Sequence, residues 1–294
     1  MIVVAIANGK GGVGKSSVAA HVSVWAARNS WRTLALDLDR QGSLAHDLGY
    51  EERITDETRF ALEDAMVRNR TLVPLADVRP NLAVVPGGWP LTDLSHRLAA
   101  SLQREGMDAF KRLHHALERV ADDYDLAVLD LPPGDPMMQT IGITASDLVV
   151  IPTSLDQVST IQGTRTVLDH VAVAQTLRTS TLPRVLGWIA TFPLPSAQRQ
   201  LAAGAAEMAR VLGAPMLGSI RYASAVAHTC RAHGWTAFEF AERAAAAEPW
   251  YRAREKGIEP ERYPANAAAV ASDYAAVANR ILTAARTLAN EGVA

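Results

Sequence analysis

Close to its start, the chain passes from a short apolar run into a glycine-rich loop and then into a helical pattern. Residues 9–16 read GKGGVGKS and fit the pattern G-x-x-x-x-G-K-[ST], with the apolar run over residues 2–8 before them. Glycines let backbone N–H groups turn toward phosphate oxygens, and the N-terminus of the following helix adds a partial positive charge. The sequence therefore predicts a nucleotide-phosphate site in which Lys15 contacts the β- and γ-phosphates and Ser16 ligates Mg²⁺.

Apolar runs alternate with helical patterns along the rest of the chain. Strands are predicted at 34–38, 127–129, 148–151, 185–190 and 216–220, and helices around 107–122, 155–178 and 197–212. Strands that alternate with helices favour a parallel sheet with helices on both of its faces. We therefore expect an α/β fold built on a twisted, mostly parallel sheet. No proline- or serine-rich linker divides the chain, so we expect a single domain over residues 1–294, with an alanine-rich helix at about 265–291.

The composition excludes several classes of protein. Hydrophobic residues make up 49% of the chain and charged residues 20%, which rules out an intrinsically disordered chain. A single cysteine, Cys230, cannot supply the ligands of a cysteine-bound zinc or iron–sulfur site within one chain. No apolar run is long enough to cross a membrane, and residues 1–4 lead into a strand without a charged leader, so we expect a cytoplasmic protein.

Lysine is scarce in this chain. Lysine and arginine together number 29, yet lysine occurs only at positions 10, 15, 111 and 256. Two of these lysines lie in the glycine-rich loop. Arginine presents a planar fork of donors, whereas lysine is a compact charge on a flexible stem. The pattern therefore indicates that the loop needs compact cations, and Lys10 stands where a generic phosphate loop requires no lysine.

Aspartates follow two of the apolar runs. Asp37 and Asp39 come at the end of the second predicted strand, and Asp130 ends a later one. We expect strand alternation to place Asp37 and Asp39 on the same face, at the carboxyl edge where parallel sheets bind ligands. Each aspartate alone could be a helix cap or part of a surface turn. A carboxylate after buried apolar residues is costly unless it serves a cation, so three of them beside a phosphate loop predict a cation site.

The loop resembles the deviant Walker A motif of the ParA/MinD ATPases over residues 10–17, KGGVGKSS. The resemblance implies the fold of a P-loop NTPase, with ATP and Mg²⁺ as ligands. Lys10 matches the family's signature lysine, which crosses a dimer interface to the nucleotide of the other subunit, so that two ATP molecules lie between two subunits. A cation supplied in this way ties dimerisation to the γ-phosphate. The nucleotide contacts that the resemblance implies are Gly11, Gly12, Val13, Gly14, Lys15, Ser16 and Ser17.

The first pair of aspartates also falls in a segment that resembles the family. Residues 36–43 are similar to switch I, and Asp39 matches by position the aspartate that orients the attacking water. The same resemblance implies that Asp39 holds a Mg²⁺-bound water, and it makes Lys10, Lys15 and Asp39 the catalytic residues. Arg40 stands where the family usually has proline, which loosens the turn because proline fixes φ.

Two later segments extend the resemblance. Residues 124–134 are similar to Walker B and switch II, which implies that Asp130 holds Mg²⁺ through a water. Gly134 replaces the serine that usually follows the two prolines of that motif. Residues 187–193 resemble the strand and loop that frame the adenine, which indicates Thr191 and Pro193 as nucleotide contacts.

Three branches of the family offer different functions. The leading interpretation is a ParA-type ATPase that forms a homodimer on ATP, binds DNA without sequence preference on the nucleoid, and positions a plasmid, chromosome or other cargo. Its slow hydrolysis would be stimulated by a ParB-like adaptor. The first alternative is a MinD-like ATPase that cycles on a membrane, but residues 279–291 lack bulky aromatics and a lysine-rich face. The second is a biosynthetic ligase, a branch that generally lacks a lysine at the position of Lys10.

DNA binding receives mixed support from the charge of the chain. The net charge is −2 and the isoelectric point is about 6.5, whereas DNA-binding domains are usually more basic. Arg221 and Arg231 match the region in which ParA proteins carry DNA-contacting residues. The alternative is that these arginines belong to an ion-paired surface, and the sequence does not choose between the two.

Overall fold

A mostly parallel sheet organises the computed structural model, which describes residues 1–154, 157–179, 181–193, 198–248, 252 and 263–292. The strands are β1 (Ile2–Ile6), β2 (Thr33–Asp37), β3 (Leu75–Arg79), β4 (Leu82–Val85), β5 (Leu126–Asp130), β6 (Leu148–Thr153), β7 (Arg184–Thr191) and β8 (Met216–Ile220). Their order in the sheet is β3-β4-β2-β5-β1-β6-β7-β8. Only the β3–β4 pair is antiparallel among these neighbours.

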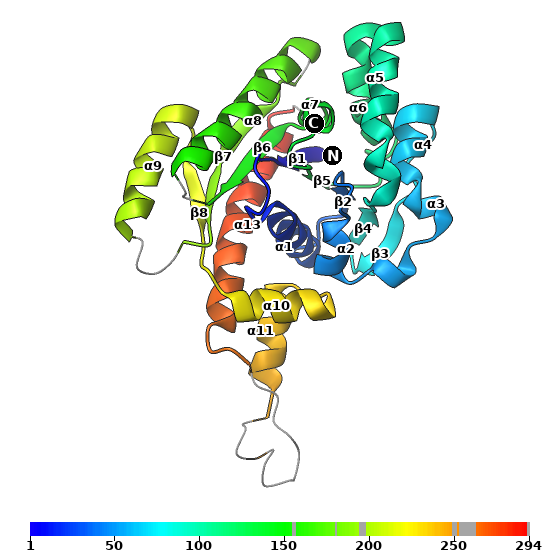
Figure 1. Ribbon diagram of the computed structural model, residues 1–294. Helices are drawn as coiled ribbons and strands as arrows, with labels where there is room; N and C mark the ends of the chain where they lie inside the picture. Colours follow the sequence, from blue (N-terminus) through cyan, green and yellow to red (C-terminus); the bar gives the residue numbers. More distant parts are fainter. Residues whose placement is uncertain (155–156, 180, 194–197, 249–251, 253–262, 293–294) are drawn as a thin grey trace.

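Helices cover both faces of this sheet (Figure 1). They are α1 (Lys15–Arg28), α2 (Ser43–Leu48), α3 (Asp56–Arg59), α4 (Ala61–Arg68), α5 (Leu94–Glu105), α6 (Arg112–Glu118), α7 (Pro136–Ala145), α8 (Gln157–Leu177), α9 (Gln198–Leu212), α10 (Ser224–His233), α11 (Ala237–Ala246) and α13 (Ala267–Asn290). One apolar core joins the sheet to α1, α2, α10, α11 and α13, and the other joins it to α4 through α9.

The strands alternate between these two cores. In β1, Ile2, Val4 and Ile6 belong to the core under α1, while Val3 and Ala5 belong to the opposite one. All five residues are buried, as a strand covered on both faces requires. The expected α/β fold with a mostly parallel sheet is therefore confirmed.

Two local elements differ from the expectation. The helix predicted around 107–122 is instead a 3-10 helix, Gly106–Lys111, followed by the short α6, which ends at Glu118. Strand β3 was not expected, because its sequence LADVR contains the exposed Asp77 and the half-buried Arg79 at the sheet edge. Its antiparallel pairing with β4 also carries a register shift, and Asp77 within it has φ 53°.

The longer predicted helices agree with the structure in their described parts. Residues 155, 156 and 197 of the predictions lie outside the described residues. The alanine-rich helix is α13, and its apolar side packs on α1, α11 and β8 rather than facing solvent. None of the helices within the described ranges combines the length and hydropathy that crossing a bilayer demands.

A buried histidine holds α1, α11 and α13 together. His21 in α1 is almost fully buried, and its ring stacks on Tyr274 of α13 with the centroids 3.5 Å apart. Its Nε2 accepts a hydrogen bond of 2.9 Å from the backbone N–H of Ala237, at the start of α11. Its Nδ1 lies 2.6 Å from the carbonyl oxygen of Ser17, so the neutral ring carries its proton on Nδ1. Burial lowers the pKa of His21 to about 4.

We expect His21 to make the protein less stable in mild acid. Because the pKa of His21 is lower in the folded state than the ordinary 6.5, the unfolded chain takes up this proton first as the pH falls. The free energy of unfolding should drop by up to about 3 kcal/mol between pH 6.5 and 4. Urea unfolding of wild type and His21→Gln across this range measures the difference in slope. His96→Gln, at an exposed histidine of α5, is the control, and the same slope in wild type and His21→Gln would contradict the assignment.

Candidate nucleotide-binding site

The glycine-rich loop connects β1 to α1 and leaves the N-terminus of α1 open. Gly14 precedes the helix with φ 81°, and no described side chain caps this end. A side chain at Gly14 would be strained at this φ, and its Cβ would lie 2.9 Å from the ring of Phe192. The backbone N–H of Lys10 donates to Oδ1 of Asn8 at 2.8 Å, which fixes the start of the loop. The open helix end provides N–H donors for an anion.

Lys15 lies in this loop with its ammonium group folded inward. The residue is 6% exposed, and its Nζ donates to the carbonyl oxygen of Lys10 at 2.9 Å. Burial lowers the pKa of Lys15, while the nearby carboxylates of Asp130 and Asp39 raise it. The side chain is thus a desolvated cation placed between the loop backbone and two acids.

Asp130 is a buried carboxylate that lacks partners. It ends β5 at 1% exposure, and neither of its oxygens has a hydrogen-bond partner among the described residues. Burial raises the pKa of Asp130 well above its ordinary value, and Asp37, its register partner in β2, raises it further. The nearby Ser16 hydroxyl and Lys15 ammonium oppose this shift. Orphaned carboxylate oxygens beside a hydroxyl are the donor set that a hard divalent cation prefers, so the residues fit Mg²⁺.

The two aspartates of the second strand have different surroundings. Strand β2 ends at Asp37, and Asp39 lies in the turn that follows it. Asp37 is fully buried and accepts from the backbone N–H of Asp39 at 2.9 Å and of Leu44, in the first turn of α2, at 3.0 Å. Burial raises the pKa of Asp37 to about 7. Asp37 therefore shapes the turn, and Asp39 alone faces the cavity described next.

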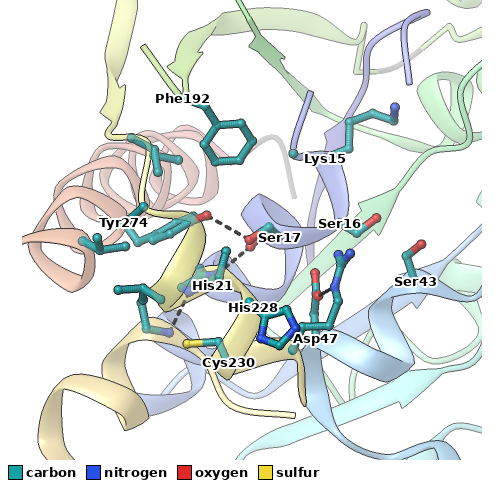
Figure 2. Close-up of a pocket in the computed structure, with 18 of the residues that line it drawn as sticks. Lys15, Ser16, Ser17, His21, Ser43, Asp47, Phe192, His228, Cys230 and Tyr274 are labelled. Atoms are coloured by element: carbon teal, nitrogen blue, oxygen red, sulfur yellow. Dashed lines mark hydrogen bonds and ion pairs between the residues drawn. The ribbon is translucent and has the colours of Figure 1, made fainter. Parts of the chain in front are cut away.

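A cavity of about 600 Å³ opens beside the loop (Figure 2). It brings together Gly12, Gly14, Lys15, Ser16, Ser17 and Asp39 among the residues predicted to bind nucleotide or metal. The loops after β7 and β8 form another wall through Phe192 and residues 220–223, and Tyr274 of α13 adds to it. Asp130 lies buried behind this lining, and Lys10, Gly11, Val13 and Pro193 are not part of it.

Two aromatic residues that the sequence did not indicate, Phe192 and Tyr274, line the cavity. Thr191 does not line the cavity: it is buried at the end of β7, 3.8 Å from where a Cβ on Gly14 would lie. Phe192 lines the cavity instead and adopts φ 59°. It lies between the two predicted residues Thr191 and Pro193, so the motif located the right loop. Nothing in the local sequence indicated Tyr274, which is far away along the chain.

The helices that line the cavity are tied to each other. Asp47 at the end of α2 forms an ion pair of 2.9 Å with Arg231 of α10. Gly49 and Gly234, which follow these helices, are in backbone contact that no Cβ could enter. Arg79 bonds both ends, donating to the carbonyl oxygens of Leu48 at 3.1 Å and Gly234 at 2.9 Å. The α2 and α10 walls are thus held as one unit.

Arg221 and Arg231 both carry ion pairs. Arg221 binds Asp273 of α13 through two hydrogen bonds of 2.6 and 2.8 Å, and the arginine side chain is 49% exposed. Arg231 binds Asp47 and is 59% exposed. Both arginines line the same cavity as the phosphate loop. The ion-paired alternative therefore describes these side chains as they stand.

Several known proteins are similar to this chain. The model of the AAA domain family matches residues 1–182, which is more than half of the chain. The chain belongs to the ParA/MinD family of ATPases. The sporulation initiation inhibitor protein Soj of Bacillus subtilis is 30% identical over 175 residues, which cover 59% of this chain and 66% of Soj. The chromosome partitioning protein ParA of Myxococcus xanthus is 31% identical over 154 residues, 51% of each chain. This ParA/MinD chain spans less than two thirds of these relatives.

Several solved structures share the fold at lower identity. Apo McdA of Cyanothece superposes with a TM-score of 0.73 at 20% identity, covering 96% of this chain and 99% of McdA. MinD of Aquifex aeolicus gives 0.65 at 17% identity, covering 96% and 98%. Cobyrinic acid a,c-diamide synthase of Mycobacterium smegmatis, with bound ADP and magnesium, gives 0.63 at 20% identity, covering 90% and 99%. Because both a cell division protein and a synthase match, the fold alone does not choose the branch.

We expect Asp130→Asn to stabilise the protein without ligand and to abolish its response to Mg²⁺. The substitution removes a buried carboxyl group that accepts no hydrogen bond, while keeping the shape of the side chain. The melting temperature of the free protein should rise by roughly 3–6 °C. The further rise that Mg²⁺ causes in the presence of ADP should disappear.

Thermal melts with and without ADP and Mg²⁺ measure both effects. The control is Asp123→Asn, which changes an exposed aspartate in the turn before β5. A normal response to Mg²⁺ in Asp130→Asn would place the cation elsewhere.

Proposed function

We propose that the chain binds ATP with Mg²⁺ and hydrolyses it to ADP and phosphate. The observation that carries this proposal is the orphaned carboxylate of Asp130 beside Lys15 and Ser16, at the open N-terminus of α1. Mg²⁺, when bound, neutralises charge on the β- and γ-phosphate oxygens. Ser16, Asp130 and Asp39 would hold it, and the structural neighbour with ADP and magnesium supports this pair of ligands for the fold.

The residues of the chain have separate roles in the proposed hydrolysis. Lys15 binds phosphate oxygens through a desolvated ammonium group, whose attraction is stronger than that of a solvated one. Asp39 orients the attacking water, because it is the aspartate of the β2 turn that lines the cavity. Its carboxylate accepts from the backbone N–H of Gln41 at 2.9 Å, which keeps the carboxylate in place before a ligand arrives. Lys10 contributes its charge to the nucleotide of a second subunit.

We expect Asp39→Ala to bind ATP but to hydrolyse it about 100-fold more slowly. Removal of a water-orienting group affects the transition state more than the bound ground state. Phosphate release and ATP titration by calorimetry separate the two effects. Lys15→Ala should lose binding itself, and Asp56→Ala, at an exposed aspartate of α3, should behave as wild type. Wild-type turnover in Asp39→Ala would move the role to another residue.

The second part of the proposal is that the ATP-bound chain dimerises and binds DNA without sequence preference, as a ParA-type positioning ATPase. Two relatives whose names refer to sporulation initiation and chromosome partitioning support this branch. DNA phosphates must compete with Asp273 for Arg221 and with Asp47 for Arg231. Because one pair of arginines has little excess charge to offer, DNA binding should need the two copies that a dimer provides. A ParB-like adaptor and association with the nucleoid complete the proposal.

The membrane-cycling alternative receives less support from α13. This helix presents its apolar residues to α1, α11 and β8, so that face is already occupied within the fold. A helix that docks on a membrane surface needs a free apolar face. The similarity to MinD of Aquifex aeolicus concerns the fold, and membrane binding is therefore an outcome that the following test includes.

We expect Arg221→Glu and Arg231→Glu to weaken DNA binding while ATP-dependent dimerisation persists. Fluorescence anisotropy with an arbitrary duplex, over a salt series and with ATP, ADP or no nucleotide, measures the effect. Wild type should bind only with ATP, with a logarithmic salt slope of about −0.9 for each phosphate engaged, and each variant should flatten that slope.

Arg210→Glu is the matched control, since Arg210 is an exposed, ion-paired arginine on α9 outside the cavity. Equal DNA binding in all nucleotide states would contradict the link to the dimer. Capture on anionic liposomes with ATP, without DNA binding, would favour the membrane-cycling alternative.

A further inference from the structure

The residue after the predicted Mg²⁺ ligand is held by the C-terminal helix. The hydroxyl of Ser17 lies 2.8 Å from the phenol oxygen of Tyr274, across 257 residues of sequence. Both side chains line the cavity, and Figure 2 shows Ser17 between Tyr274 and the phosphate-loop residue Ser16. Tyr274 itself is 5% exposed, so its hydroxyl is close to the cavity while its ring is buried.

The ring of Tyr274 is held in one orientation. It stacks on His21 with an angle of 10° between the ring planes. His21 is fixed in turn by its bonds to the carbonyl oxygen of Ser17 and to the backbone N–H of Ala237. The backbone of Ser17 is therefore bonded to His21 and its side chain to Tyr274, and these two rings are stacked on each other.

The chemistry of the two hydroxyls sets the direction of their hydrogen bond when a phosphate is present. A serine hydroxyl has one proton and two lone pairs, and a phosphate oxygen accepts but does not donate. If Ser17 donates its proton to a phosphate, its lone pair is left to accept from Tyr274. Burial raises the pKa of Tyr274, so the phenol keeps the proton that this arrangement needs. A chain of donors, from tyrosine to serine to phosphate, also strengthens each bond.

We propose that Tyr274 is a positioning residue of the nucleotide site: its hydroxyl holds Ser17 in the orientation in which Ser17 donates to a phosphate oxygen of the bound nucleotide. The inference rests on the proposed ATP site. It assigns a role in binding to α13, which lies beyond the residues 1–182 that the family model matches. The C-terminal helix thereby contributes to a site whose phosphate loop comes from the N-terminal part of the chain.

The test is a double-mutant cycle on binding of ADP with Mg²⁺, measured by calorimetry. Tyr274→Phe keeps the ring and its stacking on His21 but removes the hydroxyl. We expect it to weaken ADP binding about 3- to 10-fold, which corresponds to a single hydrogen bond of about 0.5–1.5 kcal/mol. Ser17→Ala should weaken binding at least as much. The double variant should be no weaker than Ser17→Ala, because Tyr274 acts only through Ser17.

A second readout separates positioning from support of the fold. With ATP as substrate, Tyr274→Phe should raise KM and leave kcat unchanged, because the lost contact is made equally in the ground and transition states. Tyr124→Phe, at a half-buried tyrosine outside the cavity, is the control. Unchanged or tighter ADP binding in Tyr274→Phe would overturn the inference, as would effects of the two substitutions that simply add.

Two further outcomes distinguish a failure of the proposed function from a failure of the inference about Tyr274. If wild type binds neither ADP nor ATP, the proposed function fails and the inference fails with it. If wild type binds and Tyr274→Phe melts too early to be titrated, Ser17→Ala decides, since it leaves the ring in place. A loss of less than about 3-fold in that variant would overturn the inference.

Discussion

At the end of β5, Asp130 is enclosed by the sheet, and no described group donates a hydrogen bond to its carboxylate. Its register partner in β2 is Asp37, a second buried acid, and the cation beside it is Lys15. A buried carboxylate without partners is unfavourable unless a ligand compensates it. The loop, the open helix end and the cavity all meet at this point. We therefore expect the stability of the free protein and the proposed binding of a metal-bound nucleotide to depend on the same buried carboxyl group.

The walls of the cavity are connected to Asp130 through Asp37, its register partner. This residue bonds the first turn of α2, and the far end of α2 is joined to α10 by the Asp47–Arg231 ion pair and by Arg79. Arg231 is also one of the arginines proposed to bind DNA. A change at the β2 turn that displaces α2 should therefore also displace α10, because the ion pair and the hydrogen bonds of Arg79 join the two helices.

The C-terminal third of the chain takes part in the same arrangement. His21 bonds the start of α11 and stacks on Tyr274 of α13, while Tyr274 bonds Ser17. These contacts attach the helices beyond residue 182 to the first turns of α1. The apolar side of α13 packs against the rest of the fold, and Asp273 and Tyr274 on the same helix add polar contacts to Arg221 and Ser17. The residues that support the fold here are thus also the ones proposed to position the nucleotide.

The sequence by itself determined the phosphate loop, the α/β alternation and the acid that ends β5, because each depends on neighbouring residues along the chain. Loop glycines, strand alternation and a carboxylate after an apolar run are all local patterns.

Only the tertiary structure decided which groups meet across long separations. Arg231 pairs with Asp47 at a distance of 184 residues, and Ser17 with Tyr274 at 257. The separate roles of Asp37 and Asp39 also appeared only with the fold, since they depend on where β2 stops and α2 begins. Local spacing carries no information on such partners, because the packing of helices on the sheet brings them together.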